Sequence, residues 1–90
     1  MSLTILEFAR SYVAGRLTAE IFSVAYIELW KIERDRRLLQ LDESALNECL
    51  SSIFCAADRY EPDESRAEYE LDDEVLKSEV ARLLTNIAAD

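Results

Sequence analysis

Apolar residues recur at helical spacing in four separate stretches of this chain, and nowhere do they alternate with polar residues over the length of a strand. The 90 residues include a single glycine, Gly15, and a single proline, Pro62, so the residues that tight hairpin turns need are nearly absent. Both features predict an all-α fold. Because the links between the helical stretches are mostly short, we expect an antiparallel four-helix bundle that forms a single domain over residues 1–90.

The first predicted helix covers about residues 4–14. Thr4 and Glu7 have the spacing of a capping box, and Gly15 is placed to cap the C-terminal end. One stripe of this helix is apolar and should face the core. It consists of Leu6, Ala9 and Val13, widened by Ile5, Phe8 and Tyr12.

The second predicted helix starts near Thr18, a residue type that favours the N-cap position, and ends near the arginine-rich run at residues 34–37. Its apolar residues at helical spacing predict the face that is buried in the core. That face should contain Ile21, Phe22, Ala25, Leu29 and Ile32, with Tyr26 and Trp30 on its flank.

Two candidate N-caps, Asp42 and Ser44, precede the third predicted helix, and Pro62 prevents it from continuing. If this stretch is helical, the α-carbons of Cys49 and Cys55 lie roughly 9 Å apart, too far for a disulfide, so we expect two reduced thiols. Cys55 faces away from the apolar stripe. That stripe consists of Leu46, Cys49, Leu50, Ile53, Ala57 and Tyr60, with Phe54 beside it.

A polar segment follows Pro62, and the fourth predicted helix begins after it, at Asp72 or Asp73. This helix should run to about Ala88. The residues that we expect it to bury are Leu76, Val80, Leu83, Leu84 and Ile87.

Acidic residues outnumber basic ones by 19 to 10, which gives the chain a net charge of −9. A surface this negative repels phosphate backbones and anionic lipids, so we expect direct binding neither to nucleic acid nor to membranes. It favours a cationic protein partner instead, although acidity can also serve solubility alone. No stretch reaches the ~20 apolar residues that span a bilayer, and no secretory signal pattern is present, so we expect the protein in the cytoplasm.

Most of the excess negative charge falls in residues 58–74, which hold nine acidic residues and only two basic ones, Arg59 and Arg66. The last three acids, at residues 72–74, suit the N-terminus of a helix, where negative charge is favourable. The acids that precede them crowd like charges onto a loop, which costs stability and indicates a role outside the fold. These loop acids are Glu61, Asp63, Glu64, Glu68 and Glu70.

The acidic segment does not fit a metal site. Residues 63–74 have an acid at each end, as in an EF-hand loop, but Ala67 occupies a ligand position and Glu68 stands where the turn requires glycine. The chain also has no histidine, no CxxC pair and no glycine-rich phosphate loop, which excludes the common zinc sites and histidine-assisted nucleophiles. We therefore expect no catalytic residue, no metal and no cofactor, and no enzymatic activity.

The run from Asp58 to Val80 resembles the signature of the colicin D immunity protein family, and a weaker similarity continues upstream. Ser65 and Glu68 depart from the family pattern. The elements that carry the resemblance are Tyr60-Glu61-Pro62-Asp63, Arg66-Ala67 with Tyr69-Glu70, Asp72-Asp73, and Leu76-Lys77 with Glu79-Val80.

The resemblance implies a four-helix protein that forms a 1:1 heterodimer with the basic nuclease domain of a cognate toxin. Such a toxin cuts tRNA in the anticodon loop, and the inhibitor fills its cleft with carboxylates in place of the substrate phosphates. Carried onto this chain, the resemblance assigns toxin-facing roles to five residues, and the charge argument adds Glu64 and Glu68. The five residues are Asp58, Glu61, Asp63, Tyr69 and Glu70.

A second interpretation stays open on the residues alone. The chain fits an acidic helical adaptor for protein–protein interaction, which can be dimeric and whose acidic loop serves only solubility. The broad apolar surface of the second predicted helix, with Tyr26 and Trp30 at its flank, favours this alternative.

Overall fold

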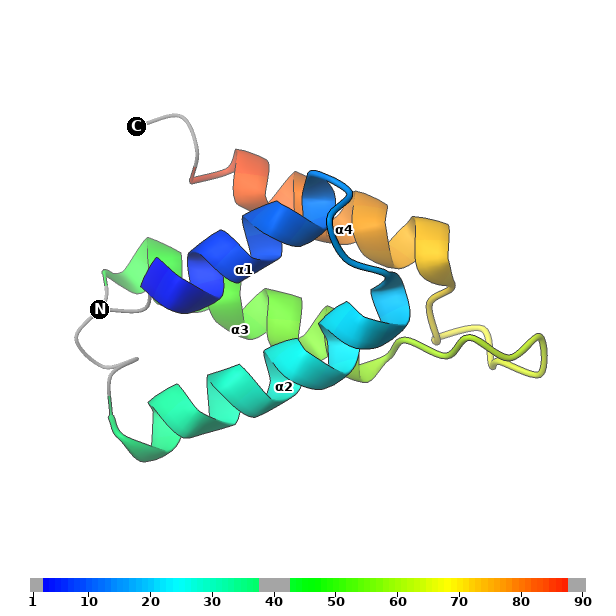
Figure 1. Ribbon diagram of the computed structural model, residues 1–90, viewed down its shortest axis with the longest axis horizontal. Coiled ribbons are helices and arrows are strands. Elements are labelled where there is room, and N and C mark those ends of the chain that lie inside the picture. The colour runs from blue at the N-terminus through cyan, green and yellow to red at the C-terminus, as the bar shows by residue number, and fades with distance from the viewer. Residues whose placement is uncertain (1–2, 38–42, 88–90) are drawn as a thin grey trace.

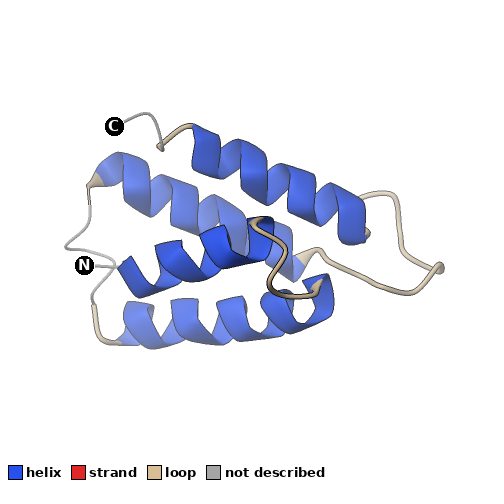
Figure 2. Cartoon of the chain, turned by 45° about the horizontal axis from the view of Figure 1, so that its top comes forward, coloured by secondary structure: helices blue, strands red, loops and turns tan. Residues whose placement is uncertain are grey.

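The computed structural model describes residues 3–37 and 43–87, which form four α-helices. Successive helices run in opposite directions, and α1 and α4 close the bundle by packing against each other (Figure 1). The described residues form helices and loops but no strand (Figure 2). The predicted all-α antiparallel four-helix bundle is therefore confirmed. The helices are α1 (Leu3–Val13), α2 (Ala19–Asp35), α3 (Ser44–Asp58) and α4 (Asp73–Thr85).

The link between α1 and α2 depends on the one glycine of the chain. Gly15 follows α1 and has a φ of +90°. The N–H of Gly15 donates to the carbonyl of Tyr12, and the N–H of Arg16 donates to the carbonyl of Ser11, as in a Schellman motif. Thr18 then caps α2, because its side chain accepts a hydrogen bond from the N–H of Ile21 at 3.2 Å. Both predicted caps are thus confirmed.

Three other predicted helix ends need correction. Thr4 cannot be the N-cap of α1, because it lies inside the helix, which starts one residue earlier. The N-cap of α3 is Glu43, which makes no side-chain capping bond, and Ser44 is already helical; the other candidate, Asp42, lies outside the described residues. α4 ends at Thr85, before the predicted end near Ala88, which also lies outside them.

Aromatic rings form the centre of the interface between α1 and α2. The ring of Phe22 stacks on that of Tyr12 with 4.1 Å between centroids and 7° between planes, and it also contacts Phe8 and Tyr26. Tyr26 is completely buried and donates its hydroxyl to the carbonyl of Leu50 at 2.7 Å, which ties α2 to α3. The polar end of the ring thus has a partner, so burying it carries no unpaired donor.

The buried face of α2 differs from the predicted one. Ile21 and Ile32 were predicted to be buried but are 56% and 50% exposed, and Val24 is also exposed, whereas Tyr26 is in the core rather than on the flank. α2 is apolar on more than one face, so spacing alone leaves its rotation open. The rotation that occurs keeps Phe22 in the core, as predicted, and adds the large ring of Tyr26 to it.

The other predicted stripes are largely confirmed. α1 buries Ile5, Leu6, Ala9 and Tyr12; α3 buries Cys49, Leu50, Ile53, Ala56 and Ala57; and α4 buries Leu76, Val80 and Leu84. The partly buried side chains that pack around them include Leu46, Phe54, Tyr60, Leu83 and Ile87. No helix in residues 3–37 and 43–87 is both long and apolar enough to cross a membrane.

Replacing Gly15 by alanine should destabilise the protein by about 1–2 kcal/mol, because an L-residue pays roughly that amount in the left-handed region. A Cβ atom at this position would meet only Nζ of Lys77, at 4.0 Å, so the cost comes from the backbone and not from a clash. Urea unfolding measures it. The exposed Ser78→Ala variant is the control and should stay within about 0.5 kcal/mol of the parent; a Gly15→Ala variant as stable as that control would contradict the prediction.

Cys55 should react with a thiol reagent much faster than Cys49 in the folded protein. Both thiols are free, but Cys55 is exposed while Cys49 is buried and donates weakly to the carbonyl of Leu83. Burial also raises the pKa of the Cys49 thiol, which lowers its thiolate fraction. Timed labelling followed by peptide mass spectrometry measures the two rates, and equal rates in the native protein would be inconsistent with this packing.

Candidate functional site

The link between α3 and α4 projects from one end of the bundle. This link, residues 59–72, is called the acidic loop below, and Figure 1 shows it extending well beyond the helix ends from which it starts. The end of α2, with Arg34, Arg36 and Arg37, lies at the opposite end of the molecule (Figure 1). The acidic loop and these arginines are therefore apart along the long axis of the molecule, which extends over 39 Å.

Backbone hydrogen bonds close the acidic loop at its base. The N–H of Leu71 donates to the carbonyl of Arg59 at 2.8 Å, and the N–H of Glu61 donates to the carbonyl of Leu71 at 2.9 Å. These bonds pair Tyr60 with Leu71 in a short parallel bridge. Compact loops whose ends meet in this way hold their own side chains in place and often carry function.

Tyr60 fixes the loop to the start of α4. Its half-buried ring packs against the core, and its hydroxyl donates to Oδ1 of Asp73 at 2.6 Å. Asp72, the residue before, accepts from the N–H of Val75 at 2.8 Å and is the N-cap of α4. The structural roles predicted for Asp72 and for the first-turn acids of α4 are confirmed, whereas the bond from Tyr60 to Asp73 could not be seen in the sequence.

Three carboxylates of the loop accept hydrogen bonds from its own backbone. Glu61 accepts from the N–H of Asp63 at 3.2 Å, Asp63 from that of Ser65 at 3.2 Å, and Glu70 from that of Ala67 at 2.8 Å. Short side-chain bonds of this kind let a turn form without regular secondary structure. These acids therefore shape the loop on which they lie.

Arg66 is half-buried in the acidic loop but makes no ion pair there. Its Nε donates to the carbonyl of Glu61 at 3.0 Å, and its Nη2 donates to the carbonyl of Pro62 at 3.3 Å. The ion pairs among the described residues lie elsewhere, joining Arg10 to Glu7, Arg34 to Asp35 and Arg82 to Glu79. In the sequence Arg66 is one of two charges opposing the acids and one element of the family resemblance, and neither feature predicts these bonds to the loop carbonyls.

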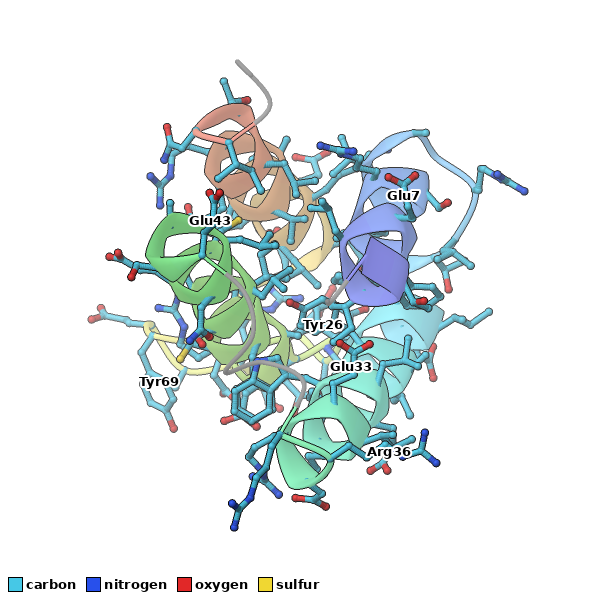
Figure 3. All side chains as sticks on the ribbon, turned by 90° about the vertical axis from the view of Figure 1, so that its left-hand side faces the viewer. Glu7, Tyr26, Glu33, Arg36, Glu43 and Tyr69 are labelled. Carbon is cyan, nitrogen blue, oxygen red and sulfur yellow. The ribbon has the colours of Figure 1, made fainter. Side chains whose placement is uncertain are left out.

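The structure brings the seven predicted site residues together on the acidic loop and the last residue of α3. Tyr69 is 69% exposed, and Figure 3 shows its ring pointing away from the bundle. Tyr69 is therefore not part of the core. Asp58, Asp63, Glu64 and Glu68 are exposed, and Glu61 and Glu70 are half-buried.

This arrangement presents negative charge and hydrogen-bond acceptors to a partner. Asp58, Glu64 and Glu68 accept no hydrogen bond from any residue in the described part of the chain, so both oxygens of each carboxylate face solvent. Within those same residues, no group of three potential ligands is arranged to hold a metal ion. The site can therefore bind a cationic surface through several charge-assisted hydrogen bonds.

Burial raises the pKa of three tyrosines. The pKa of Tyr12 rises to about 12, with a smaller contribution from the nearby charge of Asp73. The pKa of Tyr60 rises above its ordinary value of 10.0, first through burial and then because its hydroxyl donates to Asp73. The pKa of Tyr26, which is buried between α1, α2 and α3 (Figure 3), is raised most strongly, again through burial.

A family model described as bacterial self-protective colicin-like immunity matches residues 1–87 of the chain. The match includes all four helices and the whole acidic loop. None of the curated proteins with which the chain was compared matches it.

Replacing Tyr60 by phenylalanine should lower the free energy of unfolding at pH 7 by about 1 kcal/mol, because the hydrogen bond to Asp73 is lost. Urea unfolding measures this change. Tyr69→Phe is the matched control: the exposed Tyr69 hydroxyl donates to no described residue, so its removal should have no measurable effect.

The parent protein should also lose stability at alkaline pH. A tyrosine whose pKa is raised by folding adds stability that is complete below the unfolded pKa near 10 and is lost as the pH rises through the folded value. The decline from pH 10 to 12 should be shallower in the Tyr60→Phe variant, which has one fewer such group. Parallel slopes for parent and variant would show that Tyr60 does not contribute.

Proposed function

This chain belongs to the family of bacterial self-protective colicin-like immunity proteins, and from that premise we propose that its acidic loop blocks the active site of a cognate nuclease toxin. Membership indicates an inhibitor rather than an enzyme. In the proposed complex one copy of the chain binds one basic nuclease domain in the bacterial cytoplasm, where it meets neither nucleic acid nor a membrane directly.

The observation that carries the proposal is the concentration of exposed carboxylates on one closed, projecting loop. Nine of the 19 acids lie in residues 58–74, and six of the nine are on the acidic loop itself, which is held by backbone bonds at its base. Like charges crowded within one protein repel each other, but a cationic cleft on a partner attracts all of them. Complementary charge also accelerates the encounter of the two proteins.

We further propose that the toxin cuts tRNA, as the resemblance to the colicin D immunity family implies. A nuclease cleft is built for a row of phosphates, and a row of carboxylates can occupy the same cationic positions. The exposed ring of Tyr69 lies between Glu68 and Glu70 in the sequence and is free to stack in place of a base. The toxin-facing residues of the proposal are Asp58, Glu61, Asp63, Glu64, Glu68, Tyr69 and Glu70.

An adaptor that dimerises through α2 is the second candidate. Ile21, Val24 and Ile32 are all exposed on this helix, although Tyr26, which favoured the alternative in the sequence, is buried in the core. A toxin-binding assay separates the two candidates, because only the first depends on the acidic loop.

Neutralising single carboxylates of the loop should weaken toxin binding. For Glu61→Gln, Asp63→Asn and Asp58→Asn we expect losses of about 2–5 kcal/mol where the carboxylate pairs with a desolvated cation of the toxin. The amide oxygens of glutamine and asparagine can still accept the backbone bonds within the loop, so these variants change the charge and keep the shape. Titration calorimetry with the nuclease domain and protection of tRNA from cleavage are the two measurements.

The control for these variants is Glu48→Gln. Glu48 is exposed near the start of α3, at the other end of that helix from Asp58, and its replacement changes the net charge by the same amount. If the control weakens binding as much as the loop variants do, only total charge matters and the loop is not the inhibitory site. If none of the variants weakens binding, the adaptor becomes the better explanation.

A further inference from the structure

We infer that Arg66 is a positioning residue: its guanidinium holds the acidic loop in the binding-competent conformation before the toxin arrives. This inference rests on the proposed function, because it assigns a role to a cation inside the proposed inhibitory site. A positive charge at this place would on its own oppose binding to a cationic partner, so its presence needs a reason of another kind.

The contacts of Arg66 supply that reason. The planar guanidinium reaches back over the loop and donates to two successive carbonyls, those of Glu61 and Pro62. A rigid fork that bonds adjacent carbonyls fixes the orientation of the peptide units that carry them, which a single point donor cannot do. The peptide units fixed here lie next to the carboxylates of Glu61 and Asp63.

The bonds of Arg66 are also the ones that binding leaves intact. The other side-chain bonds across the loop use carboxylates of Glu61, Asp63 and Glu70, and toxin cations compete for those oxygens. The bonds from Arg66 use only carbonyl oxygens that it already occupies. The loop therefore keeps its course while its carboxylates change partners.

Arg59 provides the matched comparison. It is the other basic residue of segment 58–74, it is exposed, and its side chain makes neither a hydrogen bond nor an ion pair with the described residues. Arg59→Gln and Arg66→Gln both change the net charge of the chain from −9 to −10. If charge alone matters, both variants bind a cationic toxin faster and somewhat more tightly.

If Arg66 positions the loop, Arg66→Gln should bind the toxin more weakly than the parent, and not more tightly. If its loss reduces the binding-competent conformation to about a tenth of the molecules, the apparent Kd rises about tenfold. Arg59→Gln should bind as tightly as the parent or more tightly. Arg66→Lys keeps the charge but replaces the rigid planar fork by a single rotating ammonium, which orients the two carbonyls less well, so its Kd should lie between those of the parent and Arg66→Gln.

The experiment has one measurement without toxin and one with it. In the free protein, heteronuclear NOE values of the backbone amides in residues 63–70 report the order of the loop; they should fall in Arg66→Gln and stay at the parent values in Arg59→Gln. Surface plasmon resonance against the nuclease domain then gives Kd for the parent and the three variants. Far-ultraviolet circular dichroism verifies that each variant keeps the helices of the bundle; the loop itself is not helical.

Two results would overturn the inference: NOE values in Arg66→Gln equal to those of the parent, or a Kd for this variant as low as that of Arg59→Gln. Either can occur while Glu61→Gln and Asp63→Asn still weaken binding, in which case the proposed function stands and the role of Arg66 is wrong. If the parent does not bind the toxin, the proposed function fails, and the loop-order measurement still decides whether Arg66 orders the loop.

Discussion

The two backbone hydrogen bonds that join Leu71 to Arg59 and Glu61 determine the shape of this end of the molecule. They return the chain to within bonding distance of the place where it left α3, so the loop between is closed. Asp72, which follows Leu71, can then cap α4, and Asp73 can accept a hydrogen bond from the hydroxyl of Tyr60. The proposed inhibitory surface therefore starts and ends on the bundle, which limits the entropy that binding would have to remove.

A loop with this much negative charge faces a physical conflict, because like charges at close range repel and no ion pair within the described residues relieves them. Dipoles of the backbone stabilise several of these charges. Backbone N–H groups donate to Glu61, Asp63 and Glu70, and the N-terminus of α4 receives Asp72 and Asp73. Acids without such a donor, such as Glu64 and Glu68, lie exposed where water screens them. The residues that shape the loop and those most available to a partner are thus partly different.

Aromatic packing joins the helices of the bundle from which the loop projects. Phe22 stacks on Tyr12, and Tyr26 reaches across to the carbonyl of Leu50, so that α1, α2 and α3 share one set of contacts. The same packing explains the rotation of α2. The ring of Tyr26, whose hydroxyl has an acceptor in the carbonyl of Leu50, lies in the core, while Ile21 and Ile32 remain exposed.

The sequence by itself determined the four helices, their approximate ends, most of the core and the concentration of acids between α3 and α4, because these depend on local spacing, capping chemistry and charge. It also carried the resemblance to an immunity family. The rotation of α2 was decided by tertiary structure, since a helix that is apolar on more than one face takes its orientation from its neighbours. Tertiary structure also decided the contacts of Arg66, whose guanidinium donates to carbonyls four and five residues earlier in the chain. Only the closed loop brings those groups together; counted along the chain, Arg66 is one positive charge among many negative ones.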